Sequence, residues 1–390
     1  MGNPENNDIV ARFTDELVGV VLSALGSSAV LCVFVGGSAA TGEVSCCNVG
    51  GECEIYSDVD LYVVVGERVE LEGARRRARE AVGGLSLSGN GFRFFRAPDV
   101  GVYTFDDLAG QPARPGTVGL GAHNRVLFGD PEIPGRVAAR IGGKMSLTEA
   151  LYLVENRLSE LSGVLHAGTG ERGGPERFMA FNVCKACLDV GTAALISMGQ
   201  FAPVRRERVA LVRESSVSGQ LRERWGQGAT GLFERCAQAL EKLPSPEWAW
   251  GVGGRDTAEA VTAFALAEWK RIASECYPED ADDWSAMILR RCHTGEYVDN
   301  LRRFAVMSAR RGFSRRGAIV AGIHLSRYSA MDALRLSALM EFLYRDESIK
   351  PEIGTLIQTL GPFLERLTRA YGFVSGSLAE RSHAMYRAVQ

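Results

Sequence analysis

The chain has 390 residues, of which 46% are hydrophobic and 23% charged, and a formal net charge of −3 from 44 Lys and Arg against 47 Asp and Glu. This length exceeds what one compact core usually supports, so we expect two or three domains. The nearly balanced charge excludes a global basic field of the kind that holds nucleic acid non-specifically.

The N-terminal segment has acidic residues and no basic stretch ahead of an apolar run. No later segment reaches the roughly 18 uninterrupted apolar residues of a membrane-spanning helix. Nine cysteines without a secretory signal predict reduced thiols rather than a disulfide framework. We therefore expect a soluble, cytoplasmic protein that does not bind a membrane.

Up to about residue 145, short β-rich runs alternate with helical patterns, which is typical of a chain that mixes strands and helices. The expected elements are a helix over Asn7–Leu25, strands over Val30–Val35 and Asp58–Val65, a helix over Leu71–Val82, and strands over Phe92–Phe95 and Asp99–Phe105.

After Ser146, which is placed to cap a helix with Glu149 three positions on, the pattern is helical almost throughout. The predicted helices cover 147–165, 175–199, 216–242, 256–277, 280–291, 295–311, 327–345, 350–371 and 376–388. The fold class is therefore α+β, with a small mixed sheet and flanking helices followed by a large all-α region. Glycine and proline breaks divide it into predicted domains 1–143, 144–245 and 246–390.

Two aspartates open the apolar run Asp58–Val65. If this run is a strand, Asp58 and Asp60 project from the same face, because side chains alternate along a strand. Two adjacent carboxylates repel each other and lose solvation beside an apolar strand, and a divalent cation removes that penalty. Mg²⁺ suits such oxygen ligands and is often completed by substrate phosphates.

Gly36-Gly37-Ser38 follows the strand Val30–Val35 and precedes a possible short helix. Glycines there would let a phosphate approach the backbone N–H groups and the Ser38 hydroxyl at a helix N-terminus. The sequence thus predicts a phosphate site facing the two aspartates.

A third carboxylate is expected if two metal ions align an attacking oxygen with a leaving pyrophosphate. Asp99 is the first candidate because it begins a predicted strand, whose start must lie beside the Asp58 and Asp60 pair. Asp106 and Asp107 fall at the far end of that strand and rank lower.

Taken together, a strand, Gly-Gly-Ser, a short helix, Asp-x-Asp and a later single Asp resemble the nucleotidyltransferase fold of the DNA polymerase beta superfamily. The resemblance covers about residues 10–132, including "RVLFGDPE" at 125–132. Two later segments, "ENRLSELSG" and "VCKACLDVGTAALISMGQFAPVRRERV", are similar to the helical companion domain of bacterial small-molecule nucleotidyltransferases such as the aminoglycoside-modifying enzymes. This similarity implies that Lys185 reaches the nucleotide triphosphate and that the substrate lies between the two domains.

The chain departs from the family in the insert "VSCCNVGGECEIY", which lengthens the spacer between Ser38 and Asp58. The insert either shapes acceptor choice or is neutral decoration. Zinc binding by Cys46, Cys47 and Cys53 is disfavoured, because three thiolates leave a structural site one ligand short. For Lys185, a surface ion pair with Asp189 four residues on is the alternative to a nucleotide contact.

The predicted function is a Mg²⁺-dependent nucleotidyltransferase that moves a nucleoside monophosphate, AMP by analogy, from an NTP to a hydroxyl of a small-molecule acceptor and releases pyrophosphate. Asp58, Asp60 and Asp99 would bind two Mg²⁺ ions, with Gly36, Gly37, Ser38 and Lys185 on the nucleotide. The sequence disfavours nucleic acid as a partner, since it has no basic tract. The alternatives are transfer to RNA or protein, a non-catalytic binding or regulatory module on the same fold, and a partner-recruiting role of residues 246–390.

Overall fold

The computed structural model describes residues 4–89, 91–166, 176–226, 228–242, 254–292, 330–345 and 347–358, together with Glu365. The chain divides into two compact units. One consists of Met1–Glu149, Gly174–Leu188 and Met198–Gly254, and the other of Ala150–Gly173, Asp189–Ser197 and Arg255–Gln390. Every strand of the described residues belongs to the first unit, and the second contributes helices alone. The predicted α+β class is confirmed.

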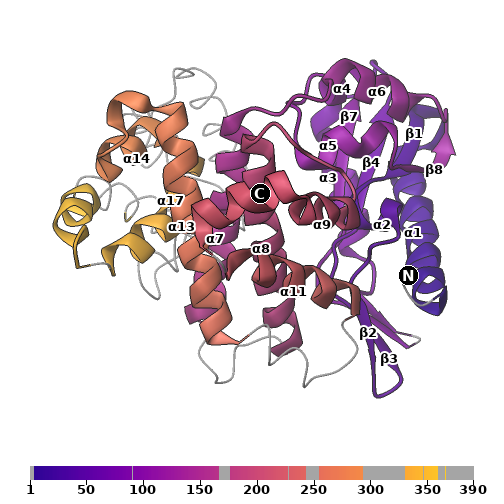
Figure 1. Ribbon diagram of the computed structural model, residues 1–390. Coiled ribbons are helices and arrows are strands. Elements are labelled where there is room, and N and C mark those ends of the chain that lie inside the picture. Colours follow the sequence, from indigo (N-terminus) through magenta and orange to yellow (C-terminus); the bar gives the residue numbers. More distant parts are fainter. Residues whose placement is uncertain are drawn as a thin grey trace. The chain divides into compact units, whose positions relative to one another are not determined.

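A four-stranded mixed sheet lies at the centre of the first unit, among the indigo and purple elements of Figure 1. Its strands are β1 (Val30–Val35), β4 (Asp60–Val65), β7 (Asp99–Thr104) and β8 (Arg125–Gly129), in the order β7-β4-β1-β8. β1 is antiparallel to both β4 and β8, whereas β7 runs parallel to β4. The parallel pairing brings the starts of β4 and β7 to the same edge of the sheet.

Helices cover both faces of this sheet because β1 alternates its buried side chains. Val33 and Val35 pack into a core with α1 (Pro4–Leu25) and α3 (Leu71–Gly83). Cys32 and Phe34 point to the opposite core, where residues of α4 (Phe105–Ala109) and α6 (Ile133–Ile141) gather. Burial on both faces fixes the position of the strand ends that carry the candidate site.

The cysteine-bearing insert forms part of a second sheet, a role that the sequence did not predict. Its strands β2 (Cys46–Val49) and β3 (Glu52–Ile55) make a hairpin, and β3 pairs in parallel with β6 (Phe92–Phe94). A short β5 (Ser88–Gly89) completes the order β2-β3-β6-β5. The buried side chains of β3 and β6 join the same core as α1, so the insert is built into the unit.

The remaining elements of the first unit are α2 (Gly37–Thr41), α5 (Pro115–Val118), the 3₁₀ turns Ser27–Ala29 and Gly119–Gly121, the first part of α8 (Glu176–Ser197), α9 (Arg205–Arg213), α10 (Ser215–Trp225) and α11 (Ala229–Lys242). Those of the second unit are α7 (Leu147–His166), the end of α8, α13 (Arg255–Cys276), the 3₁₀ turn Pro278–Asp280, α14 (Trp284–Cys292) and α17 (Ala330–Tyr344).

Three sequence-based expectations about these elements are wrong in detail. The strand predicted from Asp58 begins at Asp60, so Asp58 lies in the segment that leads into it. The single helix predicted over 216–242 is broken at Gly226, whose φ of 80° is left-handed, into α10 and α11. Helix α9 was not among the predicted helices. The helices predicted over 295–311 and 376–388 lie outside the described residues.

One helix segment, Arg177–Ser197, is long and apolar enough to cross a membrane by length and composition, yet 83% of its most apolar window is buried inside the protein. Burial of this kind is what a core helix of a soluble protein shows. No other helix in the described ranges meets the same criteria.

Candidate active site

The site is built where β1, β4 and β7 present their ends at one edge of the first sheet. Asp60 and Asp99 are register partners at the first positions of β4 and β7. The backbone N–H of Asp99 donates to the carbonyl of Val59 at 2.9 Å, which holds the start of β7 against the approach to β4. On the other side, the N–H of Gly36 at the end of β1 donates to the carbonyl of Asp60 at 3.1 Å.

The Gly36-Gly37 turn lies directly against the Asp60 carboxylate. A Cβ atom built on Gly37 would meet Asp60 Oδ2 at 2.7 Å, and the φ of Gly37 is +58°. A Cβ on Gly36 would approach Leu120 and the Tyr62 ring to 3.0 Å. Glycine is needed at Gly37 for both reasons, conformation and space. Ser38 follows in α2, which has only five residues, so the short helix adds little dipole to the backbone N–H groups of the turn.

The three carboxylates influence one another electrostatically. Burial, followed by the charges of Asp58 and Asp99, raises the pKa of Asp60 to about 7. Partial burial and the Asp58 charge raise the pKa of Asp99, the most exposed of the three. Burial would also raise the pKa of Asp58, but the charges of Lys185 and Arg96 outweigh it and lower this pKa to about 2. The geometry thus collects more negative charge than the protein compensates.

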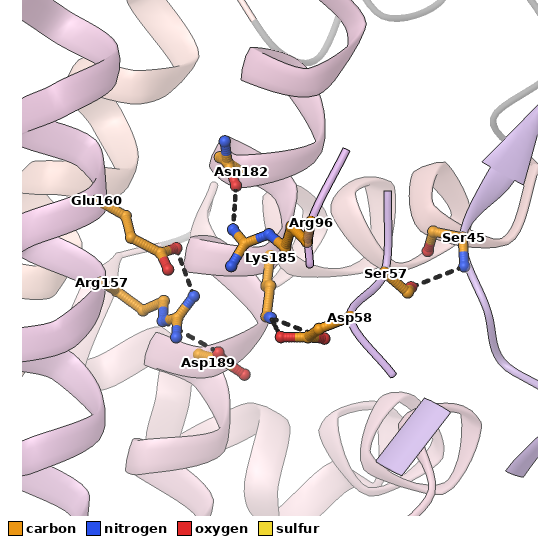
Figure 2. Close-up of polar contacts among 9 residues, drawn as sticks. All are labelled: Ser45, Ser57, Asp58, Arg96, Arg157, Glu160, Asn182, Lys185 and Asp189. Carbon is orange, nitrogen blue, oxygen red and sulfur yellow. Dashed lines mark hydrogen bonds and ion pairs between the residues drawn. The ribbon is translucent and has the colours of Figure 1, made fainter. Parts of the chain in front are cut away.

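Lys185 supplies one of the two cations, from the part of α8 that belongs to the first unit (Figure 2). Its Nζ lies 3.2 Å from Asp58 Oδ2 and 3.5 Å from Oδ1. The alternative of a surface pair with Asp189 is not what the structure shows, because the Asp189 carboxylate pairs with Arg157 at 3.2 Å. Lys185 is therefore directed at the candidate site and touches a carboxylate there, whereas its contact with a nucleotide stays a prediction.

Arg96 supplies the other cation and was missed by the sequence analysis. Its Nη2 donates to Asn182 Oδ1 at 2.6 Å, one turn before Lys185 on α8 (Figure 2). Its guanidinium lies 5.6 Å from the centre of the Phe178 ring and 5.9 Å from that of Phe181. The only sequence signal was the position of an arginine three residues ahead of Asp99, in the segment that leads into β7.

The lower-ranked acidic residues are occupied elsewhere. Asp106 forms an ion pair with Arg140. Asp107 accepts a hydrogen bond from Thr104 Oγ1 at 2.8 Å at the start of α4, at the opposite end of β7 from Asp99. Of these three aspartates, the structure brings Asp99 alone to the start of β4.

The insert thiols do not converge on one point. Cys46 and Cys53 interact on one side of the β2–β3 hairpin. Cys47 lies on the other side, where its Sγ is 3.3 Å from the Tyr56 hydroxyl, which donates to Glu54. Alternation along the strands explains the separation. The thiols of Cys184 and Cys187 are buried and interact with Cys236 of α11, consistent with helix packing.

The basic run that begins α9 is anchored to the loop after α2. The Glu43 carboxylate accepts from the backbone N–H of Arg205 at 2.9 Å and of Arg206 at 3.1 Å, which caps the helix. The buried Arg205 side chain also donates to the Glu43 carbonyl at 3.1 Å. Arg205 therefore has a structural role in holding this loop.

The donor set of Asp58, Asp60 and Asp99 fits Mg²⁺ in chemistry: oxygen ligands only, with two carboxylates whose pKa values are raised by burial and by the neighbouring Asp58 charge. Among the described residues no group of three or more His, Cys, Asp or Glu side chains is already arranged as a metal site. The Lys185 ammonium group is in contact with both Asp58 oxygens.

No protein-family model matches this chain, and a search of curated proteins finds no similar sequence.

Proposed function

We propose that the protein is a cytoplasmic, Mg²⁺-dependent nucleotidyltransferase that transfers a nucleoside monophosphate, with AMP preferred by analogy, from an NTP to a hydroxyl of a small molecule. The observation that carries the proposal is the meeting of three carboxylates with a glycine turn at one sheet edge. Asp60 pairs in register with Asp99, while Gly37 approaches the Asp60 carboxylate so closely that a Cβ atom there would force the carboxylate to move. The motif order resembles the DNA polymerase beta superfamily, and this geometry supports that resemblance.

In the proposed reaction the acceptor oxygen attacks the α-phosphorus of the NTP, and the bond from that phosphorus to the bridging oxygen breaks to release pyrophosphate. The acceptor proton passes to a carboxylate, for which Asp99 is suited because it is the most exposed of the three and has a raised pKa. Asp58 and Asp60 would hold the two metal ions, with Asp99 completing one site. When bound, the ions would offset charge on the attacking and leaving oxygens.

The nucleotide would be held from two sides of this edge. The backbone N–H groups of Gly37 and Ser38 would bind the β- and γ-phosphates, while the N–H of Gly36 is used by the Asp60 carbonyl and Gly36 would only leave room for the phosphates. Lys185 would contribute a positive charge to the same phosphates from α8. Positioning and charge compensation would account for most of the catalysis.

The experiment that tests this proposal incubates the protein with each NTP, Mg²⁺ and a pool of small hydroxylated metabolites, and measures pyrophosphate release together with product masses. A mass increase of one nucleoside monophosphate on an acceptor is expected. The variant Asp58→Asn with Asp60→Asn should reduce pyrophosphate release by about a thousandfold or more, and Asp106→Asn serves as the matched control. Undiminished release by the double variant would refute the metal assignment. Loss of activity after ribonuclease treatment of the pool would point to RNA as the acceptor.

A further inference from the structure

The carboxylates of the candidate site face two protein cations where metal ions are expected. Lys185 Nζ contacts both oxygens of Asp58, at 3.2 and 3.5 Å, so it occupies the atoms that a metal ion would need. The contact is partly shielded from water, since the Asp58 side chain is 33% exposed and that of Lys185 23%. A metal ion must displace this ammonium group before Asp58 can serve as a ligand.

Arg96 is the second cation, and it is held in place independently of the carboxylates. The buried Asn182 accepts its hydrogen bond at 2.6 Å, and two phenylalanine rings flank its guanidinium. Its positive charge acts on both Asp58 and Asp60. A guanidinium fixed by an amide and aromatic rings is pre-organised to receive an anion, and it retains its charge at any accessible pH.

The charge balance of the site favours joint binding of metal and polyphosphate. Three carboxylates face Lys185 and Arg96, and Arg79 also acts on Asp99, so at most one negative charge is left, and a first divalent ion would make the site positive and a second more so. A triphosphate brings several negative charges and gives Lys185 and Arg96 new partners when the metal takes Asp58. Metal entering alone leaves the two cations without compensation.

We propose that Lys185 and Arg96, here called the cation pair, keep divalent metal out of the carboxylate site until a nucleoside triphosphate arrives, and then bind its phosphates. This inference rests on the proposed function and adds to it an order of binding and a second phosphate-binding residue, Arg96. Because coupling between two ligands is reciprocal, the triphosphate tightens metal binding by the same factor as metal tightens triphosphate binding.

The test measures binding of Mn²⁺ alone, as a paramagnetic substitute for Mg²⁺, by electron paramagnetic resonance. Lys185→Met removes a charge in contact with a ligand carboxylate and should bind Mn²⁺ without nucleotide at least about tenfold more tightly than wild type. Arg96→Gln should tighten it several-fold. Arg93→Gln is the control, because it removes an exposed arginine of β6 that lies over the Phe95 ring, and it should bind Mn²⁺ as wild type does.

A second titration adds a non-hydrolysable nucleoside triphosphate. In the wild-type protein it should tighten Mn²⁺ binding, and in both neutral variants most of this coupling should be lost. Thermal unfolding checks that each variant is folded. If Lys185→Met does not fold, because Asp58 is left unpaired, Arg96→Gln tests the same inference without disturbing that contact.

The possible failures are distinguishable. If Asp60→Asn binds Mn²⁺ as tightly as wild type in the presence of the nucleotide, the carboxylates are not the metal site and the proposed function fails. In the other case, Asp60→Asn abolishes Mn²⁺ binding while Lys185→Met and Arg96→Gln bind Mn²⁺ alone no more tightly than wild type. The proposed role of the cation pair is then refuted, and the assignment of the metal site stands.

Discussion

Two acidic groups, one in each unit, are surrounded by protein in contrasting ways. Glu155 of α7 is fully buried and fully partnered: its carboxylate accepts from Trp269 Nε1 at 3.1 Å and from Arg291 at 3.0 and 3.2 Å. Asp60 is only partly buried, and no hydrogen bond or ion pair to its carboxylate is found among the described residues. Burial and the Asp58 charge raise the pKa of this carboxylate.

This difference distinguishes Glu155, whose charge has a structural role, from Asp60, whose charge a bound ligand would compensate. Buried charges that fold with the chain are paired, because an unpaired one is expensive. Glu155 follows this rule, so its network is sufficiently explained by stability. Asp60 breaks the rule at a position where two more carboxylates and a glycine turn converge, which is where perturbed groups mark function.

The largest expected effect on stability comes from removing the charge of Glu155. Glu155→Gln leaves Arg291 buried without its counter-charge, and the free energy of unfolding should fall by about 3 kcal/mol. Asp60→Asn should not lower it. Urea denaturation of the metal-free protein measures both. Glu259→Gln is the control, because its pair with Arg255 is exposed, at 57% and 73%, and should change stability by less than about 0.5 kcal/mol. If Asp60→Asn lowered the free energy of unfolding as much as Glu155→Gln does, the Asp60 carboxylate would have a structural role like that of Glu155.

The next effect is a dependence of the unfolding free energy on pH, which should come from the Asp60 carboxylate. The pKa of Asp60 is raised to about 7 in the folded protein from its ordinary value of 3.8, so the folded state binds the proton more tightly than the unfolded state does. Its ionisation therefore removes stability as pH rises from about 4 through 7. Relative to wild type, metal-free Asp60→Asn should gain about 2 kcal/mol in unfolding free energy between pH 5 and pH 8.

Asp58 gives the opposite sign and serves as the comparison. Lys185 and Arg96 outweigh burial and lower its pKa to about 2, so its contribution is present above about pH 4 and is lost as pH falls towards 2. Between pH 5 and pH 8, Asp58→Asn should therefore differ from wild type only through Asp60, whose pKa falls when the Asp58 charge is removed, and its gain in stability should be smaller than that of Asp60→Asn. A pH-independent difference for Asp60→Asn would indicate that the Asp60 carboxylate is compensated after all.

The α+β class and most of the first sheet could be predicted from the sequence, because local patterns carry them. β1 occupies the residues predicted for it, Val30–Val35, and Asp99 begins β7 as Pro98 and the alternation beyond it indicated. The pairing of Asp60 with Asp99 was inferred from the requirement for a third carboxylate. This pairing could be predicted because each residue begins its strand.

Features that depend on distant contacts could not be predicted. Arg96 looks like any basic residue until Asn182 and the phenylalanines of α8, more than eighty positions away, hold it against the site. The hairpin β2–β3 has weak local signals, and its pairing with β6 is what makes it a sheet. The break at Gly226 was missed because the helical pattern continues on both sides of a single glycine.

The smallest expected change in stability comes from substituting Gly37, and a comparison with Gly42 separates out the effect of the close contact between Gly37 and Asp60. Gly37→Ala and Gly42→Ala both place a Cβ on a residue with left-handed φ, +58° and +70°, so each should cost about 1 kcal/mol of stability. They differ in surroundings: the new Cβ meets Asp60 Oδ2 at 2.7 Å in the first case and nothing within 4 Å in the second.

Asp60 must turn away to accommodate the Gly37→Ala methyl group, so Mn²⁺ binding in the presence of a non-hydrolysable NTP should weaken about tenfold or more, with pyrophosphate release falling in parallel. Gly42→Ala should keep both at the wild-type level despite a similar loss of stability. Urea denaturation and Mn²⁺ titration of the two variants separate strain from site geometry. Equal metal affinities would show that the close approach of Gly37 does not position Asp60, and the glycine would then serve the turn alone.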